Sequence, residues 1–369
     1  MVMQSIIKQA SERKENGQPQ RYHSIDEELE EILSKQKAKI KVVGCGGAGN
    51  NTINRITEVG VLGCETIAIN TDAQDLLYTT ADHKILIGRE VTKGLGAGSI
   101  PQVGEEAARE TEHEIKNRLQ GADLVFITCG LGGGTGSGSV AVVAEAAKKQ
   151  NALAIAIVTL PFAMEGSRRY ENAMYGLDKL QEVVDTLIVV PNDKLLELAP
   201  DLPLHTAFKI ADEILTNAVK GISELITKAG LVNLDFADIR TVMSNGGVSM
   251  IGVGESDSQN RAVESVQKAL NNPLLDVDIA GATGALINVA GGPNMTLEEA
   301  KTVVETVSQK LNDDARVIWG AQISEDLHDV IRTMVIITGV TSPQIFGSKR
   351  ATVKRNQQSM EKDLGIDFI

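Results

Sequence analysis

The 369-residue sequence is poor in aromatic residues and has no long apolar run. Aromatic residues make up 3% of the chain, which argues against the stacking platforms that bind single-stranded nucleic acid. The net charge of −13 argues against a DNA ligand as well, so we expect no nucleic-acid partner. No stretch approaches the roughly 20 apolar residues of a membrane span, and the amino terminus shows no signal-peptide pattern. We therefore expect a cytoplasmic protein that does not span a membrane.

Cysteine is also scarce, with three residues at Cys45, Cys64 and Cys129. Each lies in or beside an apolar, strand-like run, which favours buried thiols over disulfides or a zinc site. The hydrophobic content of 42% is enough for a sizeable core. The composition thus indicates one large or two medium domains in a reducing compartment.

Short apolar runs alternate with helical patterns along most of the chain. Strands are predicted at 40–44, 66–70, 84–87, 123–129, 152–159, 186–190, 248–254, 285–290, 316–322 and 332–340. Helices are predicted at 24–37, 202–228, 258–271 and 296–310, with others between the strands of the first half. Such alternation favours a parallel sheet covered on both faces, with ligands bound outside the carboxyl ends of the strands.

The predicted fold class is therefore α/β. It has a Rossmann-like parallel-sheet domain, a long central helix and a second, smaller α/β domain with a mainly mixed sheet. The corresponding boundaries are an amino-terminal arm at 1–38, the first domain at 39–201, the central helix at 202–230, the second domain at 231–342 and a flexible tail at 343–369.

Three glycine-rich loops follow three of the predicted strands, at 44–51, 94–99 and 132–138. Glycines let backbone N–H groups close around an anion, and a following helix adds its free N–H groups and the positive end of its dipole. Because the carboxyl ends of parallel strands meet at one edge, the three loops would together enclose a di- or triphosphate. A flexible linker is the alternative for 132–138, but linkers are rarely set between a buried strand and an apolar helix.

The first loop alone also fits a dinucleotide-binding fold, because it satisfies G-x-G-x-x-G between a strand and a helix. Asp72, about 23 residues after Gly49, stands where such folds carry a ribose carboxylate. Against this, Asn50 and Asn51 put amides where those folds pack small apolar residues, and the loop at 132–138 would have no role. The chain has no Walker lysine pattern, so backbone dipoles and a metal ion would neutralise the phosphates. An NAD(P)-dependent oxidoreductase remains the alternative.

Polar side chains after later elements add candidate contacts. Glu165 would accept hydrogen bonds from ribose with Arg169 one turn on, the alternative being an i,i+4 ion pair, and Asn192 follows the next strand. Phe208 and Asp212 share a face of the long helix and would place a ring above a carboxylate. Guanine presents two adjacent donors to one carboxylate, whereas adenine does not. The alternative for Asp212 is an ordinary solvated aspartate.

Asp235 and Asp238 are three residues apart just after the long helix, so both would lie on one helix face. Paired carboxylates suit a divalent cation or an attacking water, and helix capping by Asp235 is the alternative. A helix of about 25 residues spans roughly 38 Å, which would put the pair far from the glycine loops. The pair would then act on a neighbouring subunit's ligand, and head-to-tail contacts of this kind build filaments.

As a set, these motifs resemble the FtsZ family of the tubulin/FtsZ superfamily over roughly residues 38–342, and the arm and tail resemble those of archaeal members. The segments that carry the resemblance are 44–51, 70–72, 132–138, 161–162, 165–169, 191–193, 233–238, 279–285 and 318–321. The family implies a GTPase that uses GTP/GDP and Mg²⁺, polymerises head to tail, and forms a ring at the mid-cell division site. It also implies hydrolysis across the subunit interface. A weakly hydrolysing cytoskeletal paralogue is a further alternative.

The resemblance also implies roles for individual residues. Nucleotide contacts are implied for Gly46, Gly47, Ala48, Gly49, Asn50, Asp72, Ala97, Gly98, Gly132, Gly133, Gly134, Thr135, Gly136, Glu165, Arg169, Asn192, Phe208 and Asp212. The catalytic residues would be Asn233, Asp235 and Asp238, acting on a neighbour's GTP. Mg²⁺ would be bound mainly through the GTP phosphates, without an assignable protein ligand. The apolar end of the tail, from Leu364 to Ile369, is a candidate peptide for membrane-tethering division proteins.

Overall fold

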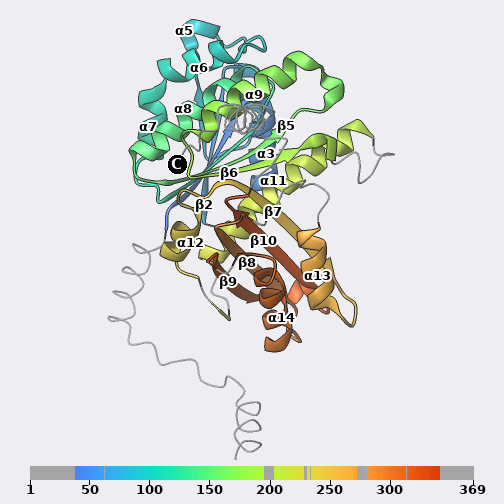
Figure 1. Ribbon diagram of the computed structural model, residues 1–369. Coiled ribbons are helices and arrows are strands. Elements are labelled where there is room, and N and C mark those ends of the chain that lie inside the picture. The colour runs from blue at the N-terminus through green and yellow to red at the C-terminus, as the bar shows by residue number, and fades with distance from the viewer. Residues whose placement is uncertain are drawn as a thin grey trace, which may run out of the picture. The chain divides into compact units, whose positions relative to one another are not determined.

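The computed structural model describes residues 38–61, 63–194, 203–227, 231–232, 234–271, 279, 281–312 and 314–340. The predicted tail, the helix at 24–37 and all of the arm except residue 38 lie outside this range. The described residues form a ten-stranded sheet in the order β3-β2-β1-β4-β5-β6-β7-β10-β8-β9 (Figure 1). Its strands are β1 (Ile40–Cys45), β2 (Cys64–Asn70), β3 (His83–Leu86), β4 (Leu124–Gly130), β5 (Leu153–Leu160), β6 (Thr186–Pro191), β7 (Gly247–Ser256), β8 (Gly284–Gly291), β9 (Arg316–Ile323) and β10 (Ile331–Thr338).

The sheet is mostly parallel, with an antiparallel insertion near one edge. All neighbouring pairs from β3 to β7 run parallel, and so does the pair of β8 and β9. Strand β10 runs antiparallel to both β7 and β8. Parallel neighbours need crossover connections, which the intervening helices supply. The predicted α/β class with a mixed second part is confirmed, and each predicted strand lies within two residues of the observed one.

Helices cover both faces of the sheet (Figure 1). One face carries α3 (Gly46–Val59), α11 (Leu204–Thr227) and α12 (Phe236–Met243). The opposite face carries α6 (Pro101–Glu110), α7 (Glu112–Leu119), α8 (Thr135–Lys149), α9 (Ser167–Gln181), α13 (Arg261–Leu270) and α14 (Leu297–Ser308). The short elements are α4 (Ala73–Tyr78), α5 (Arg89–Thr92), η1 (Ala163–Glu165) and η2 (Glu325–Leu327).

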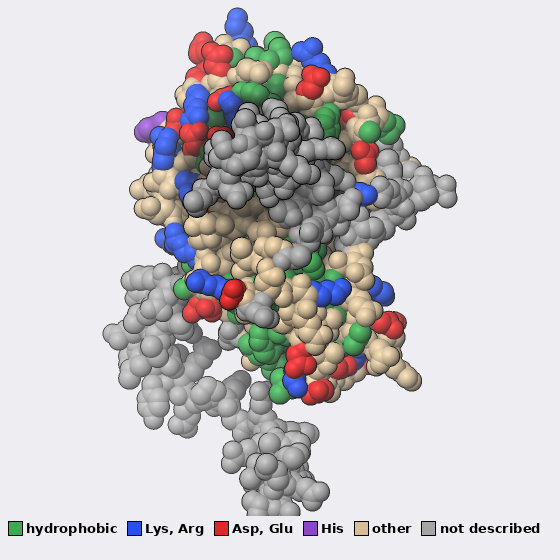
Figure 2. Space-filling view, viewed as in Figure 1, with side chains coloured by type: hydrophobic (Ala, Val, Ile, Leu, Met, Phe, Trp, Pro, Cys, Tyr) green, Lys and Arg blue, Asp and Glu red, His purple; other side chains and the backbone are tan. Residues whose placement is uncertain are grey.

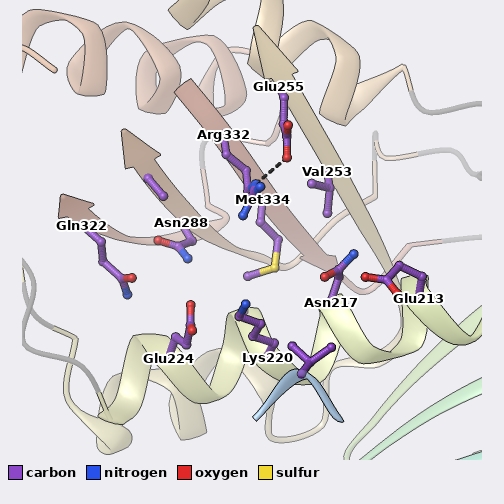
Figure 3. A pocket seen from close by; sticks show the side chains of 13 residues that line it. Glu213, Asn217, Lys220, Glu224, Val253, Glu255, Asn288, Gln322, Arg332 and Met334 are labelled. Atoms are coloured by element: carbon purple, nitrogen blue, oxygen red, sulfur yellow. Dashed lines mark hydrogen bonds and ion pairs between the residues drawn. The ribbon is translucent and has the colours of Figure 1, made fainter. Parts of the chain in front are cut away.

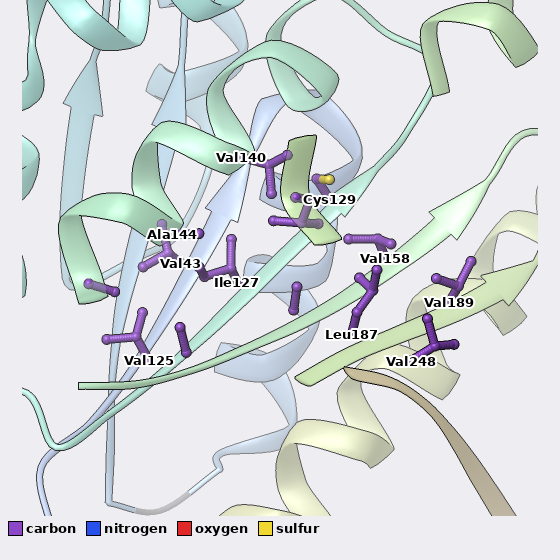
Figure 4. Packing of buried hydrophobic residues seen from close by; sticks show 14 of the residues in the cluster. Val43, Val125, Ile127, Cys129, Val140, Ala144, Val158, Leu187, Val189 and Val248 are labelled. Carbon is purple, nitrogen blue, oxygen red and sulfur yellow. The ribbon is translucent and has the colours of Figure 1, made fainter. Parts of the chain in front are cut away.

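Each face has its own apolar core, because side chains alternate between the two faces along a strand. In β1, Val42 packs under α3 and α11, whereas Val43 points to the other face. Figure 4 shows this second core, in which Val140 and Ala144 of α8 pack on side chains from the neighbouring strands. None of the described helices is long and apolar enough to cross a bilayer.

Candidate functional site

A pocket of about 750 Å³ opens at the carboxyl ends of β1, β4 and β5. Its volume lies in the usual range of small-molecule pockets. The lining residues that we predicted as ligand contacts are Gly46, Gly47, Ala48, Gly133, Gly134, Thr135, Gly136, Glu165, Arg169, Asn192, Phe208 and Asp212. The structure thus brings together residues that span more than 160 positions of the sequence, 46 to 212. The pocket lies where ligands of parallel sheets bind.

Two helix amino termini point at this pocket. Helix α3 begins directly after β1, and α8 begins directly after the loop that follows β4. Neither N-cap, Cys45 or Gly134, accepts a hydrogen bond from a backbone N–H with its side chain, so within the described residues no N-cap side chain occupies the first N–H groups of these helices. Such N–H groups, together with the helix dipoles, bind phosphate and other anions.

The loops at 44–51 and 132–138 touch each other, and this contact requires glycine. Gly46 has a φ of 71°, and a Cβ on it would lie 2.9 Å from the backbone nitrogen of Gly136. Any side chain at Gly46 would therefore push the two loops apart as well as strain the backbone. The pair forms a cradle of backbone N–H groups around one end of the pocket.

The loop at 94–99 supports this cradle instead of lining the pocket. A Cβ on Gly134 would lie 2.7 Å from the nitrogen of Ile100 and 2.9 Å from Cβ of Ala97. Of the three glycine loops that we expected to face one ligand, two line the pocket and the third packs behind them. Ala97, Gly98 and Gly132 are not among the described lining residues, so their contact with a ligand stays a prediction.

The two neighbouring asparagines of α3 lie on different faces of the helix. Asn51 lines the pocket, whereas Asn50 is fully buried and donates from Nδ2 to Oδ2 of Asp75 at 2.9 Å. Gly49 also faces inward, since a Cβ there would lie 2.7 Å from the carbonyl oxygen of Thr128. With 3.6 residues per turn, 47, 48 and 51 share one face of the helix, and 46, 49, 50 and 53 share another. This helical periodicity is the signal by which Asn51 can be recognised from the sequence as a residue that faces the pocket.

Asp72 is engaged in capping a helix. Its Oδ1 accepts from the backbone N–H groups of Gln74 at 2.9 Å and Asp75 at 3.2 Å, at the start of α4. Asp72 is absent from the described lining of the pocket. A carboxylate in this position is not the free ribose acceptor that the dinucleotide interpretation needs.

Phe208 and Asp212 lie one turn apart on α11 and both line the pocket. The ring of Phe208 makes an edge contact with buried Phe162, with 5.2 Å between centroids. Half-buried Asp212 accepts a hydrogen bond from Oγ1 of Thr52 at 3.2 Å. Burial raises the pKa of Asp212 to about 6, and the bond from Thr52 opposes this shift. A ring beside a carboxylate acceptor suits a purine that presents adjacent donors.

Glu165, Arg169 and Asn192 line the side of the pocket beside β5 and β6. Arg169 donates to Glu165 at 2.5 Å, so the ion pair that we weighed as the alternative is present. It joins η1 to α9, however, and both of its partners face the pocket. Oδ1 of Asn192 is buried and accepts no hydrogen bond within the described residues. An unsatisfied buried acceptor on a pocket wall is expected where a ligand donates.

Sequence reasoning missed several lining residues. Asn51, Thr159 and Lys209 supply polar groups, and Cys45, Gly130, Leu131, Pro161 and Ala211 complete the walls. Thr159 ends a predicted strand, and the last residues of a parallel strand lie where ligands of such sheets bind. Lys209 lies next to Phe208 on α11, and the sequence alone does not show that this stretch of the helix faces the pocket.

Asp235 and Asp238 lie on the side of the sheet opposite to the pocket, near the amino ends of the parallel strands. Arg240 of α12 donates from Nη2 to the carbonyl oxygen of Asn151 at 2.7 Å, and Asn151 precedes the amino end of β5. Thr159 lines the pocket at the other end of β5. Eight residues of strand separate the two ends by about 26 Å.

The acidic pair itself differs from the expectation of two carboxylates on one helix face. Asp235 precedes α12 as its N-cap, and its Oδ1 accepts from the N–H of Asp238 at 2.8 Å. The capping alternative is therefore present, while Asp238 lies in the first turn and both residues are exposed. Asn233 lies outside the described residues.

A second cavity of about 310 Å³ lies between α11 and strands β7, β8, β9 and β10 (Figure 3). Three carboxylates line it, from Glu213, Glu224 and Glu255, the last of which accepts from Arg332 at 2.5 Å. The cations Lys220 and Arg332 also line it, and none of its described lining residues lies in the first turn of a helix, so it offers a phosphate no free helix N–H groups. On the face shown in Figure 2, acidic and basic side chains of the described residues are interspersed. The cradle at the carboxyl edge is thus the phosphate site that the geometry supports.

A family model described as "Tubulin/FtsZ family, GTPase domain" matches residues 39–200, and one described as "FtsZ family, C-terminal domain" matches residues 247–341. The chain belongs to the FtsZ family. Cell division protein FtsZ 1 of Archaeoglobus fulgidus is 55% identical over 100% of both chains. Cell division protein FtsZ of Methanothermobacter thermautotrophicus is 56% identical over 97% of this chain and 94% of its own. A solved structure of an FtsZ dimer from M. jannaschii is 61% identical and superimposes with a TM-score of 0.81, covering 86% of this chain and 92% of that chain.

Membership of the FtsZ family confirms two predictions made from the motifs. The fold is that of tubulin and FtsZ, and the function is that of a tubulin-like GTPase of cell division. Binding of GTP and GDP follows from the same GTPase domain. The oxidoreductase alternative receives no support from any of these likenesses.

Proposed function

We propose that this member of the FtsZ family binds GTP at the carboxyl ends of its parallel strands and hydrolyses it only in a head-to-tail polymer, when α12 of the next subunit reaches that GTP. One observation carries the proposal: the nucleotide cradle and the exposed acidic pair lie at opposite edges of the same sheet. Neither can complete the other within one chain, whereas stacking two copies edge to edge brings them together. Such a heterologous contact repeats without closing and gives a filament.

In this proposal, each part of GTP meets a different wall of the pocket. The N–H groups of α3 and α8 hold the phosphates, and Glu165 and Asn192 hold the ribose. Phe208 stacks near the base, and Asp212 accepts from N1–H and N2–H₂ of guanine. Adenine offers no such pair of donors, so Asp212 selects GTP over ATP. Gly49, Asn50, Asp72, Ala97, Gly98 and Gly132 would act through the shape of the cradle or contact the nucleotide at its margin.

The acidic pair would act on the water that attacks the terminal phosphate. The Asp238 carboxylate is exposed and accepts no hydrogen bond within the described part of the chain, so it is available to another subunit. A carboxylate in reach of a water accepts its proton as the water attacks. Asp235, held beside it by the cap, adds a second negative charge, and Asn233 would complete the set as the family implies.

Mg²⁺ belongs to this proposal as a partner of the nucleotide. The described residues contain no group of three or more His, Cys, Asp or Glu that would hold a metal ion. Two acids line the pocket: Glu165 is already paired with Arg169, and Asp212 is assigned to the base in this proposal. The ion would thus be bound mainly through the phosphate oxygens, where it neutralises charge during phosphoryl transfer.

In the cell, we expect a cytoplasmic protein whose filaments gather at the mid-cell division site. The names of the relatives, which are cell division proteins, and the FtsZ dimer structure support this part of the proposal. The tail from Leu364 to Ile369 remains a candidate peptide for membrane-tethering partners and lies outside the described residues.

Phosphate release from GTP per molecule, measured with Mg²⁺ over a range of protein concentrations, tests the proposal. A rate near zero below a threshold concentration and a steep rise above it are expected, because the site exists only between subunits. A constant rate per molecule would show that each chain carries its whole active site.

A mixing experiment locates the two halves of that site. Asp212→Ala removes the base contact but keeps α12, and Asp238→Ala removes the carboxylate but keeps the pocket. Each variant alone should turn over slowly, and the mixture should exceed both, because an Asp212→Ala subunit supplies Asp238 to its neighbour's GTP. A mixture no faster than its components would contradict catalysis across the interface. A weakly hydrolysing paralogue would show slow turnover in the wild-type protein too.

A further inference from the structure

The Asp212 carboxylate, which lines the pocket, also contacts α3. Oγ1 of Thr52 lies 3.2 Å from Oδ1 of Asp212 and 3.2 Å from the carbonyl oxygen of Ala48. The Thr52 side chain is fully buried, and Ala48 lines the pocket. A hydroxyl has one proton, so Thr52 donates to one of these two oxygens at a time. An ionised carboxylate is the stronger acceptor of the two.

We infer that Thr52 is a positioning residue for guanine recognition, because its hydroxyl holds the Asp212 carboxylate in the orientation and ionisation state that the base requires. The inference rests on the proposed reading of guanine by Asp212. It adds a residue of α3 that is not among the described lining residues of the pocket and that acts through α11.

The geometry divides the acceptor capacity of Asp212 between the protein and the ligand. A carboxylate has about four lone-pair sites on two oxygens. Thr52 occupies one site on Oδ1, which pins the rotation of the carboxylate plane. The remaining sites, including both on Oδ2, are left for N1–H and N2–H₂ of guanine. A protonated Asp212 would instead present an O–H to those donors, and the match would be lost.

The electrostatic surroundings leave Thr52 as the group that offsets the burial of Asp212. Burial raises the pKa of Asp212 to about 6, and the Thr52 hydrogen bond lowers it. Among the nearby charged groups, Lys209 of α11 lines the same pocket. Two nearby acids are already paired: Glu165 with Arg169, and Glu213 with Arg55 of α3, whose Nε donates to it at 2.8 Å. Within the described residues, Thr52 supplies the hydrogen bond to the Asp212 side chain.

The direction of the pH effect follows from the raised pKa. Below a pH of about 6, Asp212 of the free protein becomes neutral, so GTP affinity should fall by up to tenfold for each further unit. Removal of the Thr52 hydroxyl removes a bond to the ionised form and raises the pKa further. The midpoint of GTP binding should then move toward neutral pH.

The test is the affinity of the full-length protein for GDP, by calorimetry, between about pH 5 and pH 9 in wild type and Thr52→Val. We expect the midpoint of the variant to rise by about one pH unit. The affinity should fall at least about twofold at pH 7, and this deficit should narrow at the highest pH, where Asp212 is ionised in both proteins. A deficit equal at every pH would overturn the inference, because a merely structural effect does not titrate.

Three further variants separate the possible outcomes. Thr52→Ser keeps a hydroxyl and should retain the wild-type midpoint, and it covers the case in which Thr52→Val does not fold. Thr216→Val removes a different fully buried hydroxyl, on α11, which has no hydrogen-bond partner in the described residues. This variant should leave the midpoint unchanged. A shifted midpoint in either of these two variants would count against Thr52.

Asp212→Asn distinguishes this inference from the proposed function. If GDP affinity is as high in Asp212→Asn as in wild type, the proposed reading of guanine is wrong. If Asp212→Asn binds weakly and shows only the titration near pH 6 that the terminal phosphate of GDP brings to every variant, while Thr52→Val keeps the wild-type midpoint, the reading of guanine stands and the role of Thr52 is wrong.

Discussion

Asp212 and Asp238 are both acidic residues of the proposed GTPase site, yet they lie at opposite edges of one sheet and in opposite surroundings. Asp212 is half-buried on α11, bonded to Thr52 and close to Phe208. Asp238 is exposed in the first turn of α12, and its backbone N–H serves the cap formed by Asp235. In the proposed function, the chain completes nucleotide recognition by itself, whereas hydrolysis needs a second copy.

The strongest test of this contrast is Asp238→Ala. Turnover should fall about 10²- to 10⁴-fold, the range of a lost general base, while GTP affinity stays unchanged because the pocket is remote. Phosphate release and equilibrium binding measure the two quantities.

A matched control for Asp238→Ala is Glu298→Ala, which removes another exposed acid from the first turn of a helix, α14. It should leave turnover unchanged. Undiminished turnover in Asp238→Ala, or an equal loss in both variants, would remove the special role of the α12 edge.

Asp212→Ala tests the recognition edge. Loss of two hydrogen bonds to a charged acceptor should lower the preference for GTP over ATP by about 10²-fold. Competition between the two nucleotides measures the ratio. An unchanged ratio would show that another group reads the base.

Gly134→Ala tests the cradle by adding one methyl group. The new Cβ would meet Ile100 and Ala97 at less than 3.0 Å, so the loop must shift, and we expect GTP affinity to fall about tenfold. Gly281→Ala is the control, because no atom of the described residues lies within 4 Å of its added Cβ. Equal affinities in the two variants would mean that the loop at 94–99 does not shape the cradle.

The smallest expected effect separates the two roles of Asp235. Asp235→Ala should lower the free energy of unfolding by about 1 kcal/mol, because the helix cap is lost. Asp235→Asn should keep most of the stability that the cap contributes, because asparagine also caps helices. If the charge also serves hydrolysis, Asp235→Asn should lose turnover with little loss of stability. Chemical denaturation and phosphate release on the same samples check both statements.

Much of the fold could be predicted from the chain because its signals are local. Apolar runs marked all ten strands to within two residues, and glycine loops marked the ligand edge. The different orientations of Asn50 and Asn51 were not predicted, although counting 3.6 residues per turn from Gly46 gives them. The contacts from Thr52 to Asp212 and from Arg240 to Asn151 join residues 160 and 89 positions apart, and no local pattern signals them.

The sequence by itself determined the family, the α/β class and the chemistry of the phosphate cradle, because these depend on residue types at short, regular spacings. Only the tertiary structure decided which glycine loop lines the pocket and which supports it, since that depends on backbone approach. It alone also places α12 at the amino end of β5 and the pocket at the other end. The pocket and the acidic pair lie at the two ends of the same parallel strands, and this separation is the physical basis for proposing a site shared between subunits.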